Sequence, residues 1–121
     1  MAITYNLKQE GKVLFVSASG MDDTVEEVKQ YAHTVASTAE ELKCTGILCD
    51  ERNLKYRLGT LDTFDLARFV AKIAPSMAKI AIVCSPEDQG DAAFFETVAV
   101  NRGLEVKSFV DYERARAWLR V

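Results

Sequence analysis

Two short segments of this chain are apolar at almost every position, residues 47–49 and residues 80–84. Side chains of a strand point alternately to its two faces, so a strand with this pattern has to be covered on both faces. Sheets covered on both faces consist mainly of parallel strands, and parallel strands need long connections that are usually helices. The two segments therefore predict an α/β protein with a mainly parallel sheet.

A long amphipathic helix is predicted between the amino-terminal region and the first of these segments. Its apolar residues recur every three or four positions. They are Val25, Val28, Ala32, Val35, Ala39 and Leu42. Asp23, with Glu26 three positions later, has the pattern of a helix N-terminus. We expect a helix over residues 24–43 that packs on the sheet, since a coiled coil requires the apolar pattern to continue over several heptads.

The other elements follow from the same periodicities and from turn residues. Strands are expected over residues 3–7 and 13–16, joined as a hairpin at Gly11, and further strands over residues 46–50, 79–85 and 105–110. Helices are expected from Thr60 or Asp62 to Pro75, over residues 91–102, and after Asp111 as N-cap. The resulting order is ββαβαβαβα, a mixed sheet with an antiparallel first strand and four helices. We expect one domain over residues 1–121.

Composition narrows the function classes. The 121 residues carry a net charge of -3, which argues against a general nucleic-acid binder. No run approaches the roughly 20 apolar residues that span a bilayer, so we expect no integral membrane protein. An odd number of cysteines, Cys44, Cys49 and Cys84, is typical of reduced thiols and indicates a cytoplasmic protein.

No catalytic motif is visible in the sequence. The six glycines are too far apart for a dinucleotide-binding loop, and no C-x-x-C pair is present. His33 is the single histidine and lacks neighbours with metal-ligand spacing. We therefore expect no metal, no cofactor and no enzymatic activity. An enzyme with Asp50 or Glu51 as general base remains a further alternative.

The segment after the strand at residues 46–50 is the predicted site. We expect a charged loop over residues 50–59, at the carboxyl edge of the sheet and ahead of a helix N-terminus that favours anions. Its cations could bind a small anion, a phosphate or carboxylate, or could simply pair with Asp50 and Glu51. The residues predicted to bind a ligand or partner here are Asp50, Arg52, Lys55, Tyr56, Arg57, Thr60 and Phe64.

The second and third predicted helices are more apolar than one buried face requires. The excess predicts either an apolar pocket or an interface with a protein partner or a second copy of the chain. The alternative is that the monomer covers all of these side chains. The residues concerned are Phe69, Ile73, Met77, Phe94 and Phe95.

The element order and the carboxyl-terminal sequence together resemble a known family. Phe109-Val110-Asp111, followed by Ala115 and Trp118-Leu119, is similar to the closing strand and helix of SpoIIAA-like proteins. These proteins are relatives of the STAS domain of anti-sigma-factor antagonists. The resemblance implies a non-enzymatic regulatory module that docks a protein partner through the loop after the third strand and the helix that follows.

The same resemblance has two further implications. In the signalling branch of the family, a Ser or Thr in this loop is phosphorylated by a partner kinase. Asp50 matches the acid of that loop, but Glu51, Arg52 and Asn53 carry no hydroxyl, so the usual phosphorylatable residue is missing. The family is also similar to Sec14-type lipid-binding domains, which implies the alternative of a small carrier for a lipid or other apolar ligand between the second and third helices.

Overall fold

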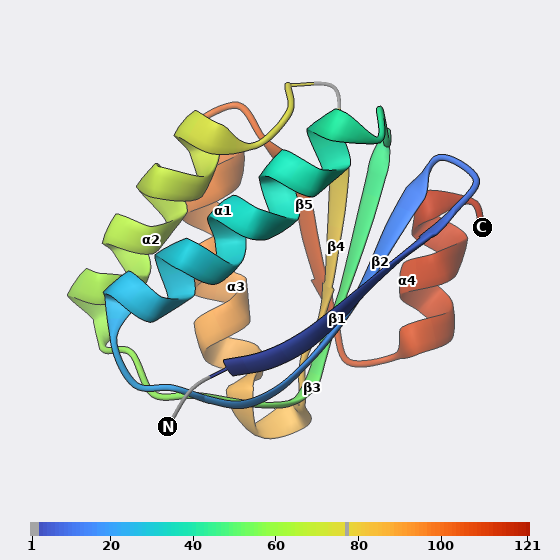
Figure 1. Cartoon of the computed structure of the whole chain (residues 1–121). Coiled ribbons are helices and arrows are strands. Elements are labelled where there is room, and N and C mark those ends of the chain that lie inside the picture. Colours follow the sequence, from blue (N-terminus) through green and yellow to red (C-terminus); the bar gives the residue numbers. More distant parts are fainter. Residues whose placement is uncertain (1–2, 77) are drawn as a thin grey trace.

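A single five-stranded sheet forms the centre of the protein, shown in Figure 1. The structure is a computed structural model that describes residues 3–76 and 78–121. The strands are β1 (Ile3–Glu10), β2 (Val13–Asp22), β3 (Gly46–Tyr56), β4 (Lys79–Val83) and β5 (Glu105–Phe109). The helices are α1 (Val25–Glu41), α2 (Thr60–Ile73), α3 (Gln89–Asn101), which follows the 3₁₀ turn η1 (Pro86–Asp88), and α4 (Tyr112–Leu119).

The strands lie in the sheet in the order in which they occur in the chain. β1 is antiparallel to β2, and β2, β3, β4 and β5 are mutually parallel. The predicted fold class is confirmed. Because the strand order never reverses, crossovers of one hand place α1, α2 and α3 on the same face of the sheet, and α4 covers the other face (Figure 1). The sheet therefore lacks the crevice that a reversal of strand order creates in doubly wound folds.

Each face of the sheet has its own core. The larger core lies under α1, α2 and α3 and includes Leu14, Val16 and Ile47. The smaller core lies under α4 and consists of Leu48, Ala81, Val83 and Ala115 with partly buried neighbours. Consecutive residues such as Ile47 and Leu48 thus enter different cores, which explains why the strand had to be apolar at every position.

The second and third strands are both longer than predicted. β2 was expected over residues 13–16 and continues to Asp22. β3 was expected to end at Asp50, but it continues to Tyr56 and pairs with β2 as far as Asp22. Most of the predicted 50–59 loop is therefore strand. The sequence contains the corresponding signal, because Leu54, Tyr56 and Leu58 alternate with Lys55 and Arg57 as in a half-buried strand.

A β-bulge interrupts this pairing. Ser17 lies opposite Asp50 and Ser19 lies opposite Asn53, so β3 contains one more residue than β2 in this interval. Without the extra residue, Glu51 and Leu54 would point to opposite faces. The bulge shifts the alternation by one position, and both side chains consequently face α1, α2 and α3.

The N-cap of α4 lies where the sequence predicted it, and the N-caps of α1 and α2 do not. α1 is capped by Thr24, whose side chain accepts a hydrogen bond from the Glu27 N–H, one residue later than the predicted Asp23. Thr60 is the first helical residue of α2 rather than its cap. Asp111 caps α4 as predicted, accepting from the Glu113 N–H at 2.9 Å.

Candidate functional site: an apolar cavity with a buried carboxyl group

A cavity of about 120 Å³ lies between the sheet and the three helices that cover it. Side chains of β3, β4, α1, α2 and α3 form its walls, together with Asp22 at the end of β2. The walls are almost entirely apolar. The lining includes Val28, Val35, Ala36, Ile47, Leu54, Leu66, Val70, Ile80, Ile82, Ala92 and Phe95.

Glu51 is a buried carboxyl group in the cavity wall, with 8% of its surface exposed. Its side chain continues the inward alternation of Ile47 and Cys49 in β3, and two phenol hydroxyls hold it there. The Tyr31 hydroxyl, from α1, donates to Oε2 at 2.7 Å, and the Tyr56 hydroxyl, from β3, donates to Oε1 at 2.5 Å. Both carboxyl oxygens thus accept hydrogen bonds from neutral groups.

Burial controls the protonation of this cluster. It raises the pKa of Glu51, because a charged carboxylate is poorly solvated in an apolar wall. The hydrogen bonds from Tyr56 and Tyr31 lower the pKa, while the charges of Asp22 and Asp50 raise it further; the net direction is upward. Burial and the Glu51 charge also raise the pKa of both tyrosines, so their hydroxyls keep their protons and act as donors.

Asp22 is a second buried carboxyl group in the wall, 5% exposed. It accepts a hydrogen bond from the Arg57 N–H, which joins the end of β2 to the end of β3. Burial raises the pKa of Asp22 to about 6, against the lowering effect of backbone N–H donors at Arg57 and Leu58. At neutral pH it is mainly ionised.

The cysteines do not form a reactive or metal-binding centre in the described part of the chain. All three are buried free thiols, and no group of three potential metal ligands comes together there. Cys49 lines the cavity, and burial raises the pKa of its thiol well above the ordinary value. Burial also raises the pKa of Cys84, to about 11. Both are therefore protonated and poorly nucleophilic.

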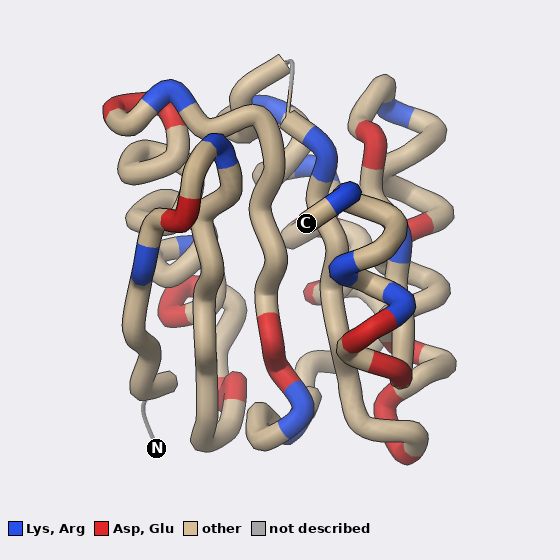
Figure 2. Tube along the Cα trace, turned by 90° about the vertical axis from the view of Figure 1, so that its right-hand side faces the viewer, with Lys and Arg blue, Asp and Glu red and all other residues tan. Residues whose placement is uncertain are grey.

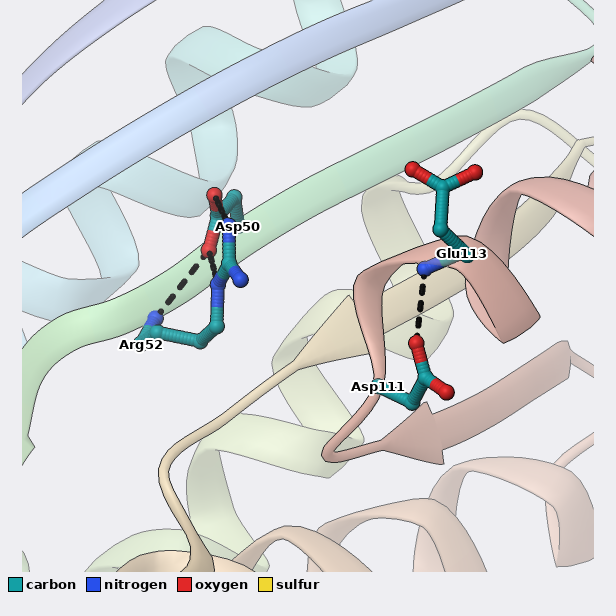
Figure 3. A network of polar contacts seen from close by, with 4 residues as sticks. All are labelled: Asp50, Arg52, Asp111 and Glu113. Atoms are coloured by element: carbon teal, nitrogen blue, oxygen red, sulfur yellow. Dashed lines mark hydrogen bonds and ion pairs between the residues drawn. The ribbon is translucent and has the colours of Figure 1, made fainter.

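The predicted cations do not gather into an anion site. Arg52 lies on the α4 face of the sheet, where Nε and Nη2 donate to the two oxygens of Asp50 at 2.8 and 2.7 Å (Figure 3). Its guanidinium also lies 5.0 Å from the centre of the Tyr112 ring. Lys55 pairs with Glu87 at 3.7 Å, and Arg57 follows the strand with an exposed side chain. Arg52 thus pairs with Asp50, as the pairing alternative expected, whereas Lys55 pairs with Glu87 rather than with Asp50 or Glu51.

The distribution of charge agrees with this reading. Figure 2 shows basic and acidic residues interspersed along the strands and α4, without a large region of one sign on the side that faces the viewer. A general electrostatic attraction for anions has no basis on that side.

The predicted apolar residues separate into two groups. Phe95 lines the cavity, whereas Phe69 and Ile73 are half-buried outside its lining, with the Lys29 Nζ 5.4 Å from the centre of the Phe69 ring. Phe94 and Phe64 are each 37% exposed. Met77 lies outside the described residues. Of the four predicted pocket residues that the structure describes, Phe95 therefore belongs to the cavity.

Comparison with known proteins identifies the fold. No protein-family model matches the sequence, and no curated protein is significantly similar to it. An anti-sigma factor antagonist from Mycobacterium paratuberculosis superposes with a TM-score of 0.66 at 14% identity, over 99% of this chain and 96% of the other. The chain has a SpoIIAA-like fold.

Two further structures agree. An uncharacterised protein with a SpoIIAA-like fold from Shewanella loihica gives a TM-score of 0.58 at 22% identity, over 98% of this chain and 94% of the other. The anti-sigma factor antagonist SpoIIAA in its unphosphorylated form gives 0.51 at 14% identity, over 97% and 98%. At these identities the likeness establishes the fold.

Within this SpoIIAA-like fold, the hydroxyl groups nearest the start of α2 differ in accessibility. Thr60 is exposed, whereas Thr63 is 8% exposed and lines the cavity. None of the described helices is long and apolar enough to cross a membrane.

The most informative cavity residues were not among the predicted binding residues. Glu51 was considered only as an alternative general base, and Tyr31 was not considered. The alternation from Leu54 to Leu58 would have identified an inward-facing strand. The orientation of Glu51 follows from the same period of two, since Ile47 and Cys49 face the cavity as well. A bulge leaves no mark in sequence periodicity, so what could not be predicted is that Leu54 and Tyr56 lie on the same face as Glu51.

Proposed function

We propose that this chain is a non-enzymatic binding module whose ligand is a small, mainly apolar molecule held in the cavity under α1, α2 and α3. The observation that carries the proposal is the cavity itself, about 120 Å³ with almost entirely apolar walls. An engineered apolar cavity of about 150 Å³ binds benzene, so this slightly smaller one suits a ligand on the order of six heavy atoms. A whole phospholipid is too large.

The cavity is not what efficient packing would produce. Protein interiors are close-packed, and each unfilled volume costs stability. Several small side chains line this one, namely Ala32, Ala36, Ala74 and Ala92. Larger residues at these positions would fill the space, and a bound ligand restores the missing contacts.

Filling the cavity tests the proposal. We expect benzene to shift the NMR resonances of cavity-lining residues in the wild-type protein, and Ala36→Leu to abolish the shifts because its side chain occupies the same space. Ala117→Leu is the matched control, since Ala117 is exposed on α4 and outside the cavity. Absence of benzene binding to the wild type, or unchanged binding to Ala36→Leu, contradicts the proposal. Native mass spectrometry of the purified protein would identify a ligand that copurifies.

A second function, docking of a protein partner, is favoured by two observations. Two of the similar structures are anti-sigma factor antagonists, so we propose an anti-sigma factor as the class of partner. In addition, Leu61 at the start of α2 is 84% exposed, far more than the other exposed large apolar residues. An exposed leucine of this kind is a suitable anchor for a partner.

A pull-down from a cell extract with a charged replacement tests this second function. Leu61→Asp should release a partner that the wild type retains, while Leu42→Asp, at an exposed position after α1, should not. A Tyr56→Ala variant would not test docking alone, because it also removes the hydroxyl that holds Glu51 in the cavity wall. Equal retention by all three proteins rules out docking at the start of α2. Light scattering distinguishes a second copy of the chain from a different partner.

The state of the cysteines supports a proposal for the cellular compartment. Three buried, free cysteines suit a reducing environment, and we therefore propose that the protein is cytoplasmic. Cell fractionation checks this assignment.

A further inference from the structure

The charges of the cavity wall all have one sign. Asp22, Glu51 and Asp91 are among the lining residues, and no Lys or Arg is found in the lining that the structure describes. We propose that the ligand is a small organic cation, an amine whose apolar body fills the cavity and whose ammonium group contacts Glu51. This inference rests on the proposed function and specifies the chemical class of its ligand.

The surroundings of Glu51 lack a positive charge. Its two described partners are the neutral hydroxyls of Tyr31 and Tyr56, and no ion pair to Glu51 is found among the described residues. Nearby cations are engaged elsewhere, Arg52 with Asp50 and Lys29 with Asp65 at 2.8 Å. A buried carboxylate is costly in free energy unless it is paired with a cation. A cation that enters the cavity would form the ion pair with Glu51 that no described basic side chain forms.

The aromatic residues of the wall support the same ligand. The rings of Tyr31, Tyr56 and Phe95 line the cavity. An aromatic face attracts an organic cation through its quadrupole, most strongly where water is excluded. An anionic ligand would instead meet three carboxyl groups, and a neutral ligand would leave the charge of Glu51 unpaired.

Protonation of Glu51 competes with the amine. The titratable groups around it are Tyr31 from α1, Asp22 from β2, Cys84 after β4, Asp91 from α3, and Cys49, Asp50 and Tyr56 from β3. None of these provides a positive charge. Burial raises the pKa of Glu51, so this carboxyl group takes up its proton at a higher pH than an ordinary glutamate does. The affinity of the cavity for an amine should therefore begin to fall at that higher pH when the solution is acidified.

A matched series of probes tests the inference. Cyclohexylamine, cyclohexanol and cyclohexanecarboxylate have similar volumes but differ in charge, and calorimetric titration at pH 7.5 compares them. We expect cyclohexylamine to bind roughly tenfold more tightly than cyclohexanol, because a charged hydrogen bond is stronger than a neutral one, and cyclohexanecarboxylate to bind most weakly. Glu51→Gln should remove the preference for the amine, and Glu41→Gln, at an exposed position at the end of α1, should retain it.

The outcomes separate the two proposals. If cyclohexanol binds as tightly as cyclohexylamine, or if Glu51→Gln keeps the amine preference, the cationic ligand is wrong while the apolar cavity remains a binding site. If neither these probes nor benzene binds, the proposed function fails as well. Should Glu51→Gln fail to fold, the wild type alone decides, since acidification must weaken cyclohexylamine binding more than cyclohexanol binding.

Discussion

At the residue scale, buried carboxyl groups distinguish this molecule from an ordinary α/β core. Asp22 and Glu51 are both less than one tenth exposed, and burial raises the pKa of each. Neither is matched by a described basic side chain. These groups make the native state dependent on pH in a direction opposite to that of a salt-bridged acid.

Asp22 provides the clearest pH dependence. Its pKa is about 6 in the native state and ordinarily 3.8, so the native state binds more protons between these values. The stability contributed by protonated Asp22 is present below about pH 4 and is lost as the pH rises through about 6. Asp22→Asn should therefore be more stable than the wild type at pH 7, by on the order of 2–3 kcal/mol, because its amide oxygen still accepts from the Arg57 N–H.

Urea unfolding at pH 4.5 and pH 7 measures this effect. The advantage of Asp22→Asn should be small at the lower pH and increase at the higher one. Some loss of stability with rising pH should persist in the variant because of Glu51. An equal difference between variant and wild type at both pH values contradicts the raised pKa of Asp22.

At the element scale, strand β3 decides where the site lies. Its first half is apolar on both faces, and Glu51 continues the inward alternation of that half. The bulge after Glu51 then brings Leu54 and Tyr56 to the same cavity face. The predicted anion loop is thus a strand whose cations point away from the cavity. α1 contributes the other hydroxyl, from Tyr31, and its N-terminus lies directly after β2.

The helix caps allow a test at this scale. Thr24→Ala removes the side chain that accepts from the Glu27 N–H, and should lower the free energy of unfolding by about 1 kcal/mol. Thr60→Ala is the matched control, since Thr60 is exposed and makes no capping hydrogen bond; its effect should stay within about 0.5 kcal/mol. Chemical denaturation measures both. A larger cost for Thr60→Ala than for Thr24→Ala contradicts the assignment of the caps.

At the scale of the whole molecule, one sheet separates two cores of unequal character. The face under α4 is closed by packed side chains such as Leu48 and Ala115, whereas the face under α1, α2 and α3 contains the cavity. The proposed binding site therefore lies on one face of the sheet, the face that also holds the larger core.

A pair of leucine substitutions tests how much the packed core under α4 contributes to stability. Leu48 is 1% exposed in the smaller core, and Leu48→Ala should lower the free energy of unfolding by about 2–5 kcal/mol through lost contacts and a new cavity. Leu61→Ala removes the same atoms from an 84% exposed position and should change it by less than about 0.5 kcal/mol. Thermal or urea unfolding gives both values, and similar values for the two variants would contradict the described burial.

The amino-acid sequence by itself determined the order of elements, the antiparallel first strand and the fold class, because these depend on local periodicity and on the handedness of crossovers. It also indicated the apolar excess of α2 and α3. Only the tertiary structure decided that β3 continues past Asp50, that Arg52 pairs with Asp50, and that Leu54 and Tyr56 share the cavity face with Glu51. The reason is physical: a single extra residue in one strand reverses which face every later side chain occupies, and only the neighbouring strand reveals it.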